Sequence, residues 1–171
     1  MYEMEKLITS LVLNRHPLVE GIKREEVLPL VEALRSRLGL SLSDLDLTPA
    51  SLSVLSRTLA NYHTSFLQAD HSFSELENVR IIREITGYLV EVFRRNYGGR
   101  LENNGGLLGV SISKDGPSTA IKGNEVRVYK KVGINLGQLA TRYWDAVAQG
   151  VERDLYKVYI LLTNRHIKES L

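Results

Sequence analysis

The sequence contains no cysteine among its 171 residues. This absence excludes disulfide bonds, cysteine-ligated zinc sites and thiol catalysis, and it is in keeping with a reducing compartment. The sequence also has no Asn-x-Ser/Thr glycosylation motif. Its first residues include acids where a secretory signal would be basic, and the apolar segment Leu7–Leu13 is too short to cross a bilayer. We therefore expect a cytoplasmic protein without a membrane-spanning segment.

Low-complexity tracts, internal repeats and linkers rich in proline or glycine are absent as well. The hydrophobic share of 43% and the charged share of 25% are those of an average globular protein, which excludes extensive disorder. A chain of this length buries a sufficient core without disulfides or metals. We expect a single domain that covers residues 1–171.

The net charge of +2 is too small to indicate nucleic-acid binding by itself. The two halves differ, however, because residues 1–78 hold 7 Lys/Arg against 11 Asp/Glu, whereas residues 79–171 hold 15 against 9. Such an asymmetry marks either an interaction surface or two halves that attract one another. Both interpretations stay open at the level of sequence.

Helical spacing of apolar residues dominates the first half of the sequence. It predicts helices over residues 2–14 and 23–38, and the second of these tolerates Pro29 only in its first turn. Thr48 and Pro49 are typical of the N-cap and the first position of a third helix.

A long fourth helix is predicted to be the centre of the fold. It is capped by Ser72 or Ser74 and ends at about Tyr97, just before Gly98 and Gly99. Two apolar rows run along it, and together they cover more than the single stripe of a surface helix. Other elements must therefore pack against this helix from several sides.

Alternating residues after the fourth helix predict a three-stranded antiparallel meander over residues 108–113, 119–122 and 125–132, with one face in water. Two helices then follow. Asn135 is placed to cap the first, which ends at Gly150.

The last helix is predicted over residues 151–164, with a fraying tail. The order of a helical first half, a central long helix, a meander and two C-terminal helices indicates an α+β fold rather than alternating βαβ units.

The most suggestive segment for function lies at the joint between the fourth helix and the sheet. Arg94, Arg95 and Arg100 surround a glycine-rich stretch that includes Asn103, and guanidinium groups and backbone amides there can hold an anion. The alternative is a helix C-cap followed by a loop, because arginines favour the negative end of a helix and phosphate sites use helix N-termini. The stretch matches neither G-x-G-x-x-G nor a Walker loop.

Glu91 is spaced for a helical ion pair with Arg95, four residues later. A general acid–base role would require a second carboxylate, for which Glu84 and Glu102 are candidates. The candidate ligand-binding residues are therefore Glu91, Arg94, Arg95, Arg100 and Asn103.

The 4 histidines show no metal-ligand spacing, and neither H-E-x-x-H nor G-x-S-x-G occurs. We expect no metal, no cofactor and no catalytic triad. Arg127, Tyr129 and Lys131 stand in line on the exposed face of the predicted last strand. Such a line is typical either of a solvated strand or of a surface that binds single-stranded nucleic acid.

The segment Gly87–Arg100 (GYLVEVFRRNYGGR) resembles a helix of the type YLGEV-RRN-GG that leads into a β-hairpin in uncharacterised bacterial proteins. The segment Leu47–Leu52 (LTPASL) is similar to the helix start D-S-P-E-S-L upstream in the same proteins. The resemblance implies a bacterial protein of unknown function and supplies no catalytic residues.

The sequence thus favours a non-enzymatic protein that binds another macromolecule, in the first place another protein, with a homodimer as the commonest assembly. Two alternatives stay open. One is a small-anion-binding protein or enzyme with a site between the fourth helix and the sheet. The other is nucleic-acid binding through the basic second half.

Overall fold

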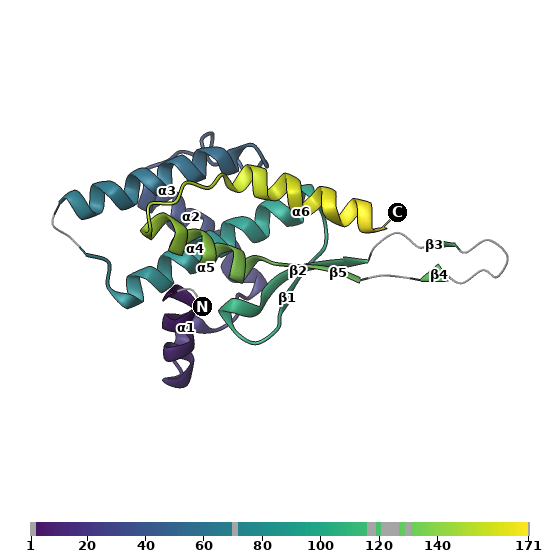
Figure 1. Ribbon diagram of the computed structural model, residues 1–171, viewed down its shortest axis with the longest axis horizontal. Coiled ribbons are helices and arrows are strands. Elements are labelled where there is room, and N and C mark those ends of the chain that lie inside the picture. Colours follow the sequence, from purple (N-terminus) through teal and green to yellow (C-terminus); the bar gives the residue numbers. More distant parts are fainter. Residues whose placement is uncertain (1–2, 70–71, 116–118, 121–126, 129–130, 171) are drawn as a thin grey trace.

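The computed structural model describes residues 3–69, 72–115, 119–120, 127–128 and 131–170 (Figure 1). Its helices are α1 (Glu3–Leu13), α2 (Val27–Leu38), α3 (Ser51–Gln68), α4 (Glu75–Asn96), α5 (Leu136–Ala148) and α6 (Leu155–Ser170). Its strands are β1 (Arg100–Asn103), β2 (Val110–Asp115), β3 (Thr119–Ala120), β4 (Arg127–Val128) and β5 (Lys131–Asn135). Short 3-10 turns are η1 (Pro17–Val19), η2 (Arg24–Glu26) and η3 (Leu107–Gly109). The predicted α+β class is confirmed.

Helix α4 lies at the centre of the fold, as its two apolar rows predict. Ile82, Leu89 and Phe93 are each at most 1% exposed, and α2 and α5 both pack against the helix. Gly87 allows α2 to approach closely, because a Cβ at this position would lie 2.7 Å from the Cβ of Leu30. The core continues from α4 onto β2, so the helix joins the two halves of the chain.

The sheet is antiparallel and three-stranded, but its strands differ from the predicted meander. Its order is β1-β2-β5, whereas β3 and β4 pair with each other as a separate ladder beyond the end of β2 and β5 (Figure 1). The last strand of the sheet is β5 rather than residues 125–132. Val132 and Ile134 are buried there and alternate with exposed Gly133. Of the predicted strands, residues 121–126 and 129–130 lie outside the described residues.

Strand β1 lies in the segment that sequence analysis treats as a loop. Arg100 pairs with Ser113 and Asn103 with Val110. The four residues of β1 show no apolar alternation, and their strand conformation depends on β2 returning alongside after the turn through η3. A pairing of this kind leaves no periodic signal within the strand itself.

Several predicted helix starts are confirmed by their capping bonds. Ser74 Oγ accepts the amide N–H of Glu77 at 3.1 Å, and Asn135 Oδ1 accepts that of Gln138 at 3.0 Å. Helix α2 begins at Val27 rather than at residue 23, so Pro29 lies in its first turn, where its missing N–H has no helical partner to lose.

Two other helix starts lie later than predicted. Thr48 Oγ1 accepts the amide of Ser51 at 3.3 Å, as a cap should, but the residues between them form a tighter turn and α3 begins at Ser51. Helix α6 begins after Asp154, whose Oδ1 accepts the amide of Tyr156 at 2.9 Å. It continues to Ser170, beyond its predicted end.

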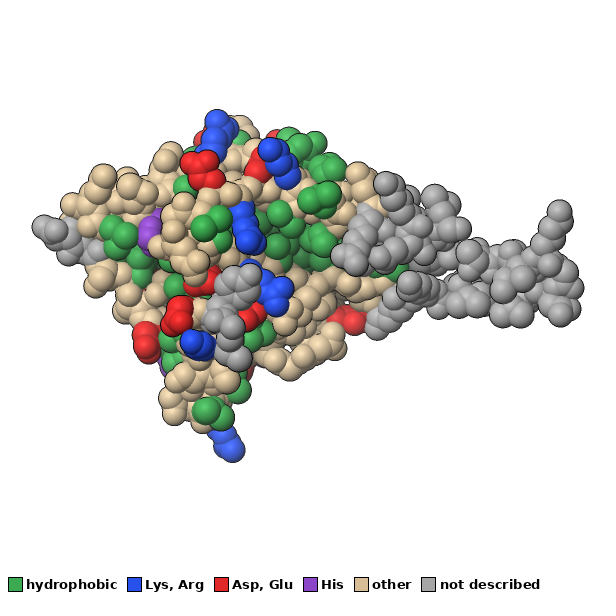
Figure 2. All heavy atoms as spheres, in the orientation of Figure 1, with side chains coloured by type: hydrophobic (Ala, Val, Ile, Leu, Met, Phe, Trp, Pro, Cys, Tyr) green, Lys and Arg blue, Asp and Glu red, His purple; other side chains and the backbone are tan. Residues whose placement is uncertain are grey.

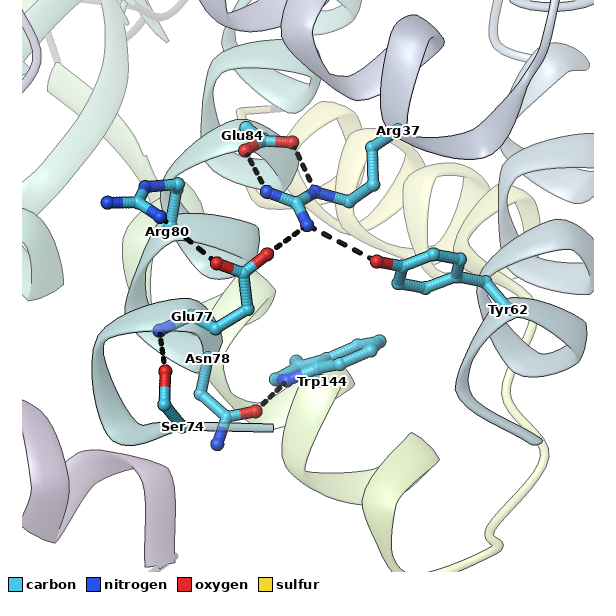
Figure 3. Close-up of polar contacts among 8 residues, drawn as sticks. All are labelled: Arg37, Tyr62, Ser74, Glu77, Asn78, Arg80, Glu84 and Trp144. Atoms are coloured by element: carbon cyan, nitrogen blue, oxygen red, sulfur yellow. Dashed lines mark hydrogen bonds and ion pairs between the residues drawn. The ribbon is translucent and has the colours of Figure 1, made fainter. Parts of the chain in front are cut away.

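An ion-pair network ties α2 and α3 to α4 (Figure 3). Arg37 of α2 donates two parallel bonds to Glu84 of α4, at 2.8 and 2.7 Å. The same guanidinium also bonds to Glu77 and, at 3.3 Å, to Tyr62 of α3. The bonds to Glu84 in particular hold the pKa of Arg37 above its ordinary value, so this guanidinium stays charged although it is largely buried.

A second arginine of α4 holds the segment that precedes α2. Arg83 donates to the backbone carbonyls of Glu20 at 2.7 Å and Gly21 at 3.2 Å, and it pairs with Glu26. These bonds fix the path of η2 along α4, and with it the position of Arg24.

We expect Glu84→Ala to lower the free energy of unfolding by about 3 kcal/mol, because it leaves the guanidinium of Arg37 buried with two of its four side-chain hydrogen bonds removed. Arg80→Ala is the matched control: Arg80 pairs with Glu77 in the same network, but its side chain is 53% exposed. This control should cost less than about 1 kcal/mol. Chemical denaturation of the two variants checks the difference, and equal losses would contradict it.

Candidate functional site

A cleft of about 680 Å³ opens between the start of α2, the end of α4 and strand β1. It brings together parts of the chain that are far apart in sequence. Its lining residues are Arg24, Val27 and Leu28 on the α2 side, Val90, Glu91 and Arg94 on α4, and Gly99, Arg100, Leu101 and Asn103 on the β1 side. We call this site the arginine cleft.

Asn103 joins the α2 side of the cleft to the β1 side. Its Oδ1 accepts the amide N–H of Ile22 at 2.8 Å, and its Nδ2 donates to the carbonyl of the same residue at 3.0 Å. A Cβ on Gly21 would lie 2.3 Å from Asn103 Oδ1, so the close approach requires glycine. Both polar groups of the Asn103 side chain are therefore used to hold the walls together.

The turn from α4 into β1 depends on two glycines. Gly98 and Gly99 have φ values of 93° and 108°, a region that other residues rarely adopt. Gly98 N–H donates to the carbonyl of Phe93 at 2.9 Å, which closes the helix end. A Cβ on Gly99 would also lie 2.9 Å from the carbonyl oxygen of Ser113. The predicted C-cap thus leads directly into a strand instead of a loop.

Glu91 is buried just before the last turn of α4, and its carboxylate is paired with two arginines of that turn. Its Oε1 accepts bonds from Arg94 at 2.7 Å and from Arg95 at 2.6 Å. Burial opposes ionisation of this carboxyl, but the bonds from the two arginines outweigh it and set its pKa below the ordinary value. Glu91 therefore serves as an ion-pair partner, and Glu84, a candidate second carboxylate, is bound by Arg37 instead.

Arg24 and Arg100 give the cleft its charge. Both side chains belong to exposed residues, and neither makes a hydrogen bond or ion pair with any residue that the structure describes. Val27 and Val90 are buried behind them, and Leu28 lies at the rim, 54% exposed. The site combines unpaired positive charge with an apolar wall.

Of the five candidate residues, the structure brings four to the cleft. Arg95 is not among its lining residues, and Asn103 lines it while engaged with Ile22. Sequence analysis missed Arg24 and the apolar residues beside it. The sequence does show two adjacent basic residues, Lys23 and Arg24, just before α2. Nothing in their neighbourhood in the sequence indicates that they lie near Arg100 in the fold.

A second groove, of about 880 Å³, lies between α3, α5 and the start of α6. Its basic residues Arg57, Arg153 and Lys157 are interspersed with Glu152 and Asp154. Figure 2 likewise shows basic and acidic side chains intermixed on one face of the molecule. Mixed charge gives this groove no preference for a ligand of one sign, so the arginine cleft is the better candidate site.

Within the described ranges, no group of three or more His, Asp or Glu side chains is placed to hold a metal ion. No helix in those ranges has the length and apolar character needed to cross a membrane. The predicted line of Arg127, Tyr129 and Lys131 lies outside the side chains that the structure describes.

Comparisons with protein-family models, with curated proteins and with solved structures give no match to this chain. The resemblance to uncharacterised bacterial proteins therefore stays a prediction.

The paired state of Glu91 predicts a pH dependence. Because its folded pKa lies below the ordinary value of 4.5, the ion pair stabilises the fold above about pH 4.5 and loses this effect as pH falls through the lower folded value. Glu91→Gln should lower the free energy of unfolding by about 1 kcal/mol at pH 7. The difference from the unsubstituted protein should shrink below pH 4.5. Denaturation curves between neutral and acidic pH measure it; a constant difference would be contrary to this role.

Asn103 gives a second test of structural against ligand roles. Asn103→Ala should lower the free energy of unfolding by about 1–2 kcal/mol, because Ile22 loses both of its side-chain hydrogen bonds. The neighbouring exposed residue offers a control, since Asn104→Ala should change stability by less than about 0.5 kcal/mol. Thermal or chemical unfolding measures the stability of both variants. If Asn103→Ala is as stable as the unsubstituted protein, the Asn103 amide has no structural role and is again a candidate ligand-binding group.

Proposed function

We propose that this protein acts by binding rather than by catalysis, and that the arginine cleft holds an acidic segment of a partner protein. The observation that carries the proposal is the pair Arg24 and Arg100. These are two exposed guanidinium groups on different walls of one cleft, without a partner among the described residues.

Charge complementarity supports an acidic occupant. Arg94 adds a third guanidinium to the cleft, and the single carboxylate among the lining residues, Glu91, is already neutralised by Arg94 and Arg95. Guanidinium groups match carboxylates in planar, two-bond geometry, and such bonds strengthen beside an apolar wall that displaces water. An acidic group that enters the cleft meets a positive excess.

The apolar lining favours a protein segment over a small anion. Leu101 lines the cleft and is half-buried, and Leu28 is largely exposed at its rim. A small anion would leave this surface in contact with water, whereas a segment with both acidic and apolar side chains covers it. The paired state of Glu91 also supports binding over catalysis, because a general acid or base needs an exchangeable proton near the substrate.

We expect a fluorescent peptide of alternating glutamate and valine to bind the protein saturably at low salt. Arg24→Glu and Arg100→Glu should each weaken this binding about tenfold or more, because charge reversal turns attraction into repulsion at the site. Fluorescence anisotropy titration measures the affinities. Arg57→Glu on α3 is the matched control: it makes the same change in net charge at an exposed position outside the cleft and should leave the affinity unchanged.

Three results would contradict the proposal. Equal weakening by Arg57→Glu would indicate a general charge effect. Tighter binding of a single-stranded oligonucleotide that also depends on Arg24 and Arg100 would favour the nucleic-acid alternative. Complete displacement of the peptide by equimolar phosphate or citrate would favour a small-anion site, the second candidate function of the same cleft.

A further inference from the structure

Strand β1 is an edge of the sheet. The strand order is β1-β2-β5, and no strand in the described part of the chain pairs with the other side of β1. This free edge faces the arginine cleft, since Gly99, Arg100, Leu101 and Asn103 line it. A row of backbone N–H and C=O groups at an unpaired edge is a template for another strand.

The register of the sheet identifies which backbone groups are free. Asn104 N–H donates to the carbonyl of Gly109 at 2.9 Å, and the pairing continues with Asn103 opposite Val110. In an antiparallel ladder, hydrogen-bonded pairs alternate with non-bonded pairs. Arg100 and Glu102 therefore bond to β2, while the N–H and C=O groups of Leu101 and Asn103 point away from it, toward the open edge.

The same cleft that Leu101 and Asn103 line is also lined by Val27 at the start of α2 and by Val90 on α4. The side-chain amide of Asn103 is already engaged there, because it pairs with both backbone groups of Ile22. A groove between an edge strand and a helix is one of the recurring sites at which proteins receive an extended peptide.

We propose that the partner segment binds as an added β-strand along the free edge of β1, with acidic side chains toward Arg24 and Arg100. This inference rests on the proposed function and specifies the conformation of the partner. Main-chain bonds to Leu101 provide affinity without regard to sequence, and the guanidinium groups select for acidic residues.

Backbone N-methylation of the glutamate–valine peptide tests the added strand. Methylation removes one N–H donor and leaves every side chain unchanged. In an added strand, the backbone N–H groups of every second residue bond to β1 and those between them point away. A series of peptides, each methylated at one position along the chain, should therefore alternate between weakened and unchanged affinity. Affinity is expected to fall about tenfold at every second position near the centre of the peptide and to change little between them.

Hydrogen exchange of the protein in its unmodified form provides a second measurement. Saturation with the peptide should slow exchange of the Leu101 amide about tenfold or more, because this N–H gains a partner. The amides of Arg100 and Glu102 already bond to β2 and serve as internal controls with little change.

The outcomes separate the two proposals. If the peptide binds in a manner that depends on Arg24 and Arg100, but N-methylation shows no alternation and Leu101 exchange is unchanged, the added strand is wrong and the acidic-segment function stands. If the unmodified peptide does not bind, both proposals are wrong. Alternation together with slower Leu101 exchange supports both.

Discussion

Burial of α4 on all sides along residues 81–93 is the constraint on which the rest of the structure depends. A helix enclosed by other elements cannot leave a charged side chain without a partner, since an isolated buried charge is costly. Helix α4 carries three such residues, Arg83, Glu84 and Glu91, each less than one-tenth exposed. Each is satisfied by a different part of the chain. The pairing requirements of one helix thus determine where α2, the segment before α2 and the last turn of α4 lie.

The arginine cleft is a consequence of these pairings. Arg83 holds the segment before α2 against α4, and Asn103 holds the same segment against β1. Glu91 binds Arg94 at the third wall. The walls are fixed by internal bonds, whereas the side chains of Arg24 and Arg100 make no bond to a described residue. A site whose walls are already ordered loses less conformational entropy on binding, so that modest contacts suffice for useful affinity.

Features of this fold that depend on neighbours in sequence are predictable, and features that depend on distant contacts are not. The two apolar rows of α4 and the cap at Asn135 can be inferred because their signals lie within a few residues. Strand β1 cannot, because its partner returns only after the turn through η3. The two arginines of the cleft differ in the same way. Arg100 can be predicted as a site residue because it lies in a glycine-rich, basic segment. Arg24 cannot, because it reaches the site only through the bonds that Arg83 and Asn103 make to the segment before α2.

The opposed charge of the two halves of the chain is explained in part by ion pairs between them. Arg83 pairs with Glu26, and Arg142 pairs with Glu5. In both pairs a basic residue of the second half contacts an acidic residue of the first, as expected if the two halves attract one another. Arg37 and Glu84 pair in the opposite sense, so the interface between the halves does not consume the whole excess. Some of what remains lies at Arg100, on the β1 wall of the cleft. In the binding mode proposed above, this positive charge beside the sheet edge attracts an acidic strand to it.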